Sequence, residues 1–85
     1  MAFMESLFEM LALLRAARAL VGLTQEELAN RAGISRQMLA RIEAAGSGIQ
    51  VAAVEKVRKA LQREGVEFLP STPDHGPGVA MKKRR

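Results

Sequence analysis

The sequence has 85 residues and contains no Cys, Trp or Tyr. The absence of cysteine excludes disulfides, thiolate zinc sites and cysteine nucleophiles. A single histidine, His75, and a single aspartate, Asp74, leave too few side chains for a histidine-rich metal site or a catalytic triad. We therefore expect a protein that is not an enzyme and that binds neither a metal nor a cofactor.

Long uncharged apolar runs are also lacking. Residues 1–23 are rich in apolar side chains, but no stretch within them reaches the roughly 18 uncharged residues that a membrane helix needs. No basic segment precedes this region, as one does in a signal peptide. We expect a cytoplasmic protein without a membrane partner. The charged residues that interrupt the region are Glu5, Glu9, Arg15 and Arg18.

The net charge of +4 belongs to the C-terminal tail. The thirteen Lys and Arg residues include the last four residues of the chain, so nine remain against nine Asp and Glu residues. The body of the chain is therefore neutral. Two interpretations of the tail stay open: a disordered solubilising segment, or a segment that binds nucleic-acid phosphates without sequence preference. The tail consists of Lys82, Lys83, Arg84 and Arg85.

Helix-forming residues dominate the N-terminal part, and the length fits one small domain. Residues 3–21 hold no Gly or Pro and predict a long helix that Gly22 ends. Because this helix is apolar on more than one face, we expect its first dozen residues to pack on another chain. One apolar stripe holds Phe3, Leu7, Met10, Leu14, Ala17 and Val21; a second holds Met4, Phe8 and Leu11.

Three shorter helices and a hairpin are expected after Gly22. A capping box of Thr24 and Glu27 opens a helix that runs to residue 32 and that Gly33 ends. Ser35 caps a third helix over residues 36–45. The fourth spans residues 50–64, with Val51, Val54, Val57 (or the stem of Arg58) and Leu61 buried. Residues 66–69 and 78–81 flank turn-forming residues and indicate a short β-hairpin.

Residues 25–43 have the spacing of a helix-turn-helix. Ala29 is small, as the close crossing of two helices requires, and Gly33 suits a turn with positive φ. Five apolar residues occupy the positions that hold such a pair against the neighbouring helices. They are Leu28, Ala32, Ile34, Leu39 and Ile42.

From Leu14 to Leu69 the chain resembles the Cro/cI-type (XRE, lambda-repressor-like) transcriptional regulators. The resemblance implies a mainly α, lambda-repressor-like helix-turn-helix domain of about four helices, and binding to double-stranded DNA. We divide the chain into an apolar N-terminal extension (1–13), the DNA-binding domain (14–65), the hairpin (66–81) and the basic tail (82–85).

The resemblance also implies roles for single residues. The third helix would lie in the major groove, where Arg suits guanine and Gln suits adenine. Arg36, Gln37 and Arg41 are the expected base-reading residues, so we expect Arg41→Ala to relax specificity at one base pair. The expected phosphate-binding residues are Gln25, Thr24, Ser35 and Gln50. Met38 and Arg31, together with the tail, are further candidates for DNA contact.

Two other features come from the same resemblance. Arg18 and Glu43 match a pair that forms an internal salt bridge between the first and third helices in relatives. Relatives often carry Lys or Arg in the loop after the third helix, whereas residues 44–49 of this chain hold no charge. We therefore expect backbone affinity to come from helix-end amides, from Arg31 or Arg36, or from the tail.

We expect a nucleoid-associated transcriptional regulator, by default a repressor, that binds an inverted repeat as a homodimer. One alternative is an antitoxin that also represses its own operon. Another is an architectural or recombination-directionality factor that bends DNA. A toxin or an anti-regulator is the candidate protein partner. The expected dimer contacts are Phe3, Leu7, Phe8, Leu11 and Phe68.

Overall fold

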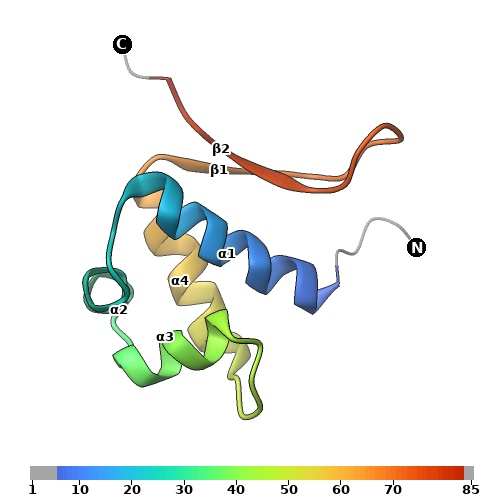
Figure 1. The fold of residues 1–85 in the computed structure, drawn as a ribbon. Coiled ribbons are helices and arrows are strands. Elements are labelled where there is room, and N and C mark those ends of the chain that lie inside the picture. Colours follow the sequence, from blue (N-terminus) through green and yellow to red (C-terminus); the bar gives the residue numbers. More distant parts are fainter. Residues whose placement is uncertain (1–5, 84–85) are drawn as a thin grey trace.

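The computed structural model describes residues 6–83, which form four helices and a two-stranded antiparallel sheet. Helix α1 crosses the middle of the molecule, with the hairpin on one side and α3 on the other (Figure 1). The predicted mainly α fold with a C-terminal hairpin is confirmed. The elements are α1 (Leu7–Val21), α2 (Gln25–Ala32), α3 (Arg36–Glu43), α4 (Val51–Arg63), β1 (Val66–Leu69) and β2 (Gly78–Met81).

Helix α1 begins later than the sequence predicted. Ser6 has extended backbone angles, and its hydroxyl accepts a hydrogen bond from the Glu9 N–H at 3.0 Å. The Glu9 carboxylate accepts the Ser6 N–H at 3.4 Å, which completes a capping box. The prediction of a helix continuous from residue 3 is therefore wrong. Phe3 and Met4 lie outside the described residues.

The helix-turn-helix has the predicted start and turn, but α3 is shorter than predicted. Thr24 caps α2 with Glu27, and Gly33 ends α2 at φ 73°. The third helix ends at Glu43 rather than at residue 45, because Ala45 adopts a positive φ of 55°. A tight turn therefore leads out of the last turn of α3.

The core receives side chains from every helix and from β1. Four of the five predicted helix-turn-helix apolar residues are buried, and Ile34 packs against them half-buried. Val51 was predicted to be buried but is 76% exposed. It lies about 120° around α4 from the buried Val57, outside the core-facing stripe. The largest fully buried side chains are Leu14, Leu28, Leu39, Ile42, Leu61, Val57 and Val66.

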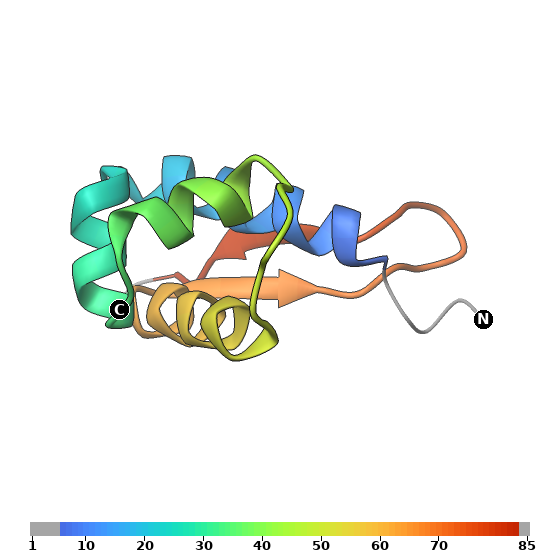
Figure 2. The same ribbon diagram turned by 90° about the horizontal axis from the view of Figure 1, so that it is seen from below.

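The hairpin closes the core beside α1 and α4. Strand β1 contacts α4 and β2 contacts α1 (Figure 2). Val66 pairs with Met81, and Phe68 pairs with Val79. The Arg58 guanidinium lies 5.6 Å from the centre of the Phe68 ring. Because a two-stranded hairpin is barely stable alone, its packing on these helices makes it part of the same folded unit.

Within residues 6–83, no helix combines the length and the apolar character required to cross a membrane.

Two valines of α4 test this description of the core. Val57→Ala removes methyl groups from a fully buried site, whereas Val51→Ala makes the same change at an exposed one. We expect Val57→Ala to lower the free energy of unfolding by about 1–3 kcal/mol more than Val51→Ala. Urea unfolding followed by circular dichroism measures the difference, and equal losses would contradict the placement of α4.

Candidate nucleic-acid interface

The α2–turn–α3 unit is held by its backbone. Ala29 is 2% exposed at the crossing, where its carbonyl accepts the Ile34 N–H at 3.0 Å. The Gly33 N–H donates to Asn30 at 3.3 Å, with Gly33 in the left-handed conformation. The angle between α2 and α3 is thus set by a turn that a side chain beyond hydrogen would strain.

The N-terminal end of α3 carries unused donors. The Ser35 hydroxyl accepts the Met38 N–H at 3.0 Å, which leaves its own O–H free to donate. The backbone N–H groups of Arg36 and Gln37 donate to no group in the described part of the chain. Both side chains are exposed. This end of α3 therefore presents a guanidinium, an amide and free N–H groups to solvent.

The start of α2 is built in the same way. The Thr24 hydroxyl accepts the Glu27 N–H at 3.0 Å, and the Glu27 carboxylate accepts the Thr24 N–H at 2.8 Å. The hydrogen bond that the Thr24 backbone N–H donates to the carboxylate is the main cause that holds the pKa of Glu27 below its ordinary value. The predicted capping box is confirmed, and the Thr24 O–H remains available as a donor.

A buried carboxylate connects the first three helices. Glu43 is 6% exposed, and its carboxylate accepts hydrogen bonds from Arg18 Nε at 2.7 Å and from Arg18 Nη2 at 3.0 Å. The hydrogen bond to Glu43 raises the pKa of Arg18. The predicted Arg18–Glu43 salt bridge is confirmed. The Gln25 side chain also donates to this carboxylate, from Nε2 at 3.0 Å.

The contact between Gln25 and Glu43 was missed in the sequence. It joins residues from different helices, so no local spacing signals it. Gln25 Nε2 carries a second hydrogen, which remains for another acceptor. The amide is therefore held in place at the start of α2 rather than free to rotate.

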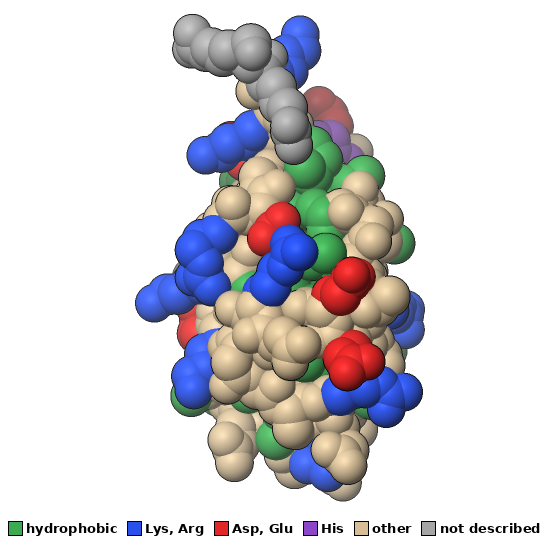
Figure 3. Space-filling model, turned by 90° about the vertical axis from the view of Figure 1, so that its left-hand side faces the viewer, with side chains coloured by type: hydrophobic (Ala, Val, Ile, Leu, Met, Phe, Trp, Pro, Cys, Tyr) green, Lys and Arg blue, Asp and Glu red, His purple; other side chains and the backbone are tan. Residues whose placement is uncertain are grey.

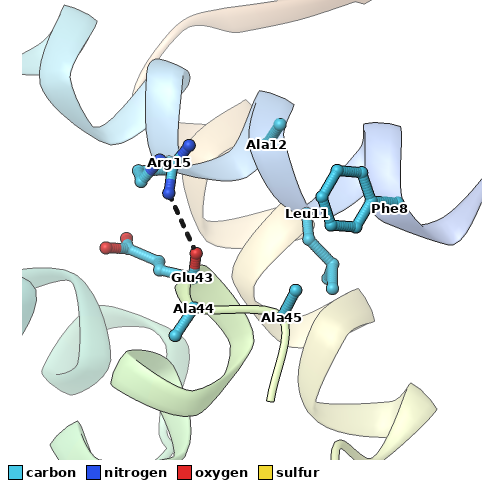
Figure 4. Close-up of a pocket in the computed structure, with 7 residues that line it drawn as sticks. All are labelled: Phe8, Leu11, Ala12, Arg15, Glu43, Ala44 and Ala45. Atoms are coloured by element: carbon cyan, nitrogen blue, oxygen red, sulfur yellow. Dashed lines mark hydrogen bonds between the residues drawn. The ribbon is translucent and has the colours of Figure 1, made fainter.

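Arg15 makes a further link, because its Nη1 donates to the Glu43 carbonyl at 3.2 Å. Figure 4 shows this bond at the edge of a hollow between α1 and the end of α3, with Phe8 and Leu11 on its far side. The hollow has a volume of about 100 Å³, well below the size of a typical ligand site. We therefore interpret it as a small gap in the packing of α1 on α3 and not as a ligand site.

Side chains predicted to bind DNA line two open hollows. One joins Arg36 to Thr24 and Gln25, beside Arg18. The other joins Ser35 and Gln50, and the side chain of Lys56 lines it as well. Lys56 was not among the predicted residues. A lysine on α4 gives no sequence signal that it reaches the start of α3.

The remaining candidates are placed differently. Arg31 pairs with Glu64 at 2.8 Å, and Met38 is half-buried against the core. Lys82 and Lys83 are exposed after β2, and Arg84 and Arg85 lie outside the described residues. Figure 3 shows both basic and acidic side chains on the face on the α2 side, with the basic ones more numerous along the left edge of the view.

Leu11 was predicted as a dimer contact but is 3% exposed in the core of the chain itself. Phe68 is half-buried beneath Arg58. Leu7 and Phe8 remain exposed, at 58% and 73%. The large exposed apolar side chains of α1 are therefore Leu7 and Phe8 in its first turn and Leu20, 49% exposed, in its last turn, among the described residues.

Comparison with known proteins agrees with this geometry. The model of the Helix-turn-helix family, of the XRE/Cro-cI type, matches residues 14–68. The chain belongs to this family. An uncharacterized HTH-type transcriptional regulator from Methanothermobacter thermautotrophicus is 38% identical over 55 residues, which cover 65% of this chain and 80% of the relative.

Membership in the helix-turn-helix family makes the chain a DNA-binding protein of transcription regulation. The family is a DNA-binding regulatory one and not an enzyme family.

The buried carboxylate of this domain gives a stability test. We expect Glu43→Gln to lower the free energy of unfolding by about 3 kcal/mol, because it leaves Arg18 without its ionic partner. Glu55→Gln removes an exposed carboxylate that lies 3.6 Å from Arg58, and it should cost less than about 0.5 kcal/mol. Urea unfolding of both variants measures the two losses of unfolding free energy. Similar losses would argue against a stabilising role of the buried Glu43 carboxylate.

Proposed function

We propose that this protein is a sequence-specific transcriptional regulator, by default a repressor, that binds an inverted-repeat operator as a homodimer. The observation that carries the proposal is the division of α3 into two faces. Leu39, Ile42 and Glu43 are buried, whereas Arg36 and Gln37 are exposed beside free backbone N–H groups. In the proposed complex α3 enters the major groove, with these two side chains at base edges.

Phosphate contacts would flank the base-reading end of α3. The hydroxyls of Thr24 and Ser35 have hydrogens left to donate, and so does Gln25 Nε2. Gln50 is exposed and makes no capping hydrogen bond. Such contacts position a protein on the duplex without carrying sequence information. The tail that begins at Lys82 adds affinity of the same kind.

The homodimer is proposed to form through the first turn of α1. Leu7 and Phe8 are adjacent and exposed, at the end of the molecule opposite α2 (Figure 1). Two copies joined there would leave both α3 helices free. The common spacing of half-sites is one helical turn, about 34 Å.

The same two side chains also suit a second function. An antitoxin needs an apolar surface that binds its toxin and lies apart from the DNA-binding helix. Leu7 and Phe8 are exposed, and they lie in the first turn of α1, at the other end of the molecule from the start of α3 (Figure 1). A small basic protein that co-purifies with this chain would favour this alternative over the homodimer, if substitutions at Leu7 and Phe8 abolish the co-purification.

Selection of bound sequences from a random DNA pool tests the main proposal. We expect the unaltered protein to enrich a two-fold symmetric motif at physiological salt. Arg36→Ala should cost about 1–3 kcal/mol at one base pair of each half-site and leave the other positions unchanged. Lys59→Ala is the matched control, since it removes one exposed charge on the solvent face of α4. The absence of an enriched motif would contradict the proposal.

Light scattering tests the dimer surface. We expect Leu7→Glu with Phe8→Glu to convert a dimer into a monomer, because two carboxylates cannot be buried there without partners. Leu20→Glu is the matched control at the other end of α1, where Leu20 is 49% exposed. A dimer that persists in the double variant, or that is lost equally with Leu20→Glu, would exclude this surface.

A further inference from the structure

The loop after α3 has no charge of its own, but a basic side chain lies along it. A Cβ atom placed on Gly46 would come within 3.2 Å of Arg41 Cγ, and one placed on Gly48 would lie 3.9 Å from Arg41 Nη1. The stem of Arg41 therefore packs on Gly46, and its guanidinium reaches the part of the loop around Gly48. The two glycines leave the room that this arrangement needs.

The guanidinium of Arg41 is not used by the protein itself. The ion pairs found within residues 6–83 join Arg18 to Glu43, Arg31 to Glu64 and Arg58 to Glu55. No hydrogen bond from the Arg41 side chain occurs in this part of the chain, and the residue is exposed. Arg41 therefore holds a full positive charge with all its donors available.

The loop contributes donors next to this charge. The backbone N–H groups of Ser47, Gly48 and Ile49 make no hydrogen bond within the described residues. Gly48 has a φ of 75° and lies beside the Arg41 guanidinium. Backbone N–H groups and an unpaired guanidinium share one preferred ligand, which is an anion.

The position of Arg41 along α3 separates it from the base-reading end. Arg41 lies in the last turn, five residues after Arg36, which is about 7.5 Å along the helix axis. Its side chain follows the loop instead of extending beyond Arg36 and Gln37. We predicted from the sequence position alone that Arg41 reads a base. That prediction took no account of the packing of Arg41 on the loop.

We propose that Arg41 and the N–H groups of residues 47–49 form a binding site for one phosphate of the DNA backbone. The inference rests on the proposed function, because it needs α3 to lie against DNA. Arg41 then positions the protein and does not read a base. It supplies the charge that the loop lacks, from the preceding helix.

Binding measurements on Arg41→Ala test the site. The affinity is measured by fluorescence anisotropy for the selected operator, for its single-base-pair variants and for unrelated duplex DNA, at several salt concentrations. We expect the same loss, about tenfold, on every DNA. The slope of log K against log salt should become smaller by about one. Lys59→Ala should leave the affinity within about twofold.

Gly46→Ala provides a second variant that keeps the Arg41 charge. Gly46 has no positive φ, so alanine fits the backbone, but its methyl group would displace the Arg41 stem. We expect a uniform loss of affinity that is smaller than that of Arg41→Ala. The double variant should bind no more weakly than Arg41→Ala alone, because both changes act on the same contact.

Two results would overturn the proposal. A loss confined to one base pair would show that Arg41 reads a base, and an unchanged salt slope would show that it contacts no phosphate. Failure of the proposed function is a separate result, in which the unaltered protein prefers no sequence. Arg41→Ala should then still weaken binding to unrelated DNA, because a phosphate contact does not depend on sequence.

Discussion

The carboxylate of Glu43 is the constraint on which the arrangement of the first three helices depends. A buried charge is costly unless it is paired and fully hydrogen-bonded. Here two nitrogens of Arg18 and one of Gln25 bond to the carboxylate, while Arg15 bonds to the backbone carbonyl of the same residue. The donors come from α1 and from the start of α2, so a shift of α3 against either helix would leave the charge without partners.

This anchor lies at the last residue of α3, and the exposed first turn lies at the opposite end of this eight-residue helix. The buried face of α3 and the Glu43 contacts fix its orientation, and the Ser35 hydroxyl caps its first turn. Side chains that are to reach base edges need such a rigid support, because a misplaced donor loses its partner. The same carboxylate restrains the Gln25 amide, so the proposed phosphate contact and the proposed base contacts share one support.

Local signals in the sequence were sufficient for most of the fold. The capping box of Thr24 and the turn at Gly33 act within a few residues, and both were predicted. The similar capping box at Ser6 was overlooked because it lies inside an apolar, helix-forming stretch. The bond from Gln25 to Glu43 and the packing of Arg41 on Gly46 depend on how helices and loop meet in space. Position in a motif therefore nominates candidates for DNA contact, but it does not predict which neighbouring residues hold their side chains in place.

Because the body of the chain is neutral, the proposed dimer also matters for the affinity for DNA. A domain whose basic residues are matched by acidic ones has little net attraction for DNA, and its affinity rises with the number of phosphates that it contacts. Joining two copies doubles the phosphate contacts in one binding event, so DNA affinity becomes coupled to self-association. The first turn of α1, which holds Leu7 and Phe8, lies at the end of the molecule opposite the start of α3 (Figure 1). A protein that covers this dimer surface would weaken DNA binding without contacting the start of α3. By the same coupling, bound DNA would weaken the binding of that protein.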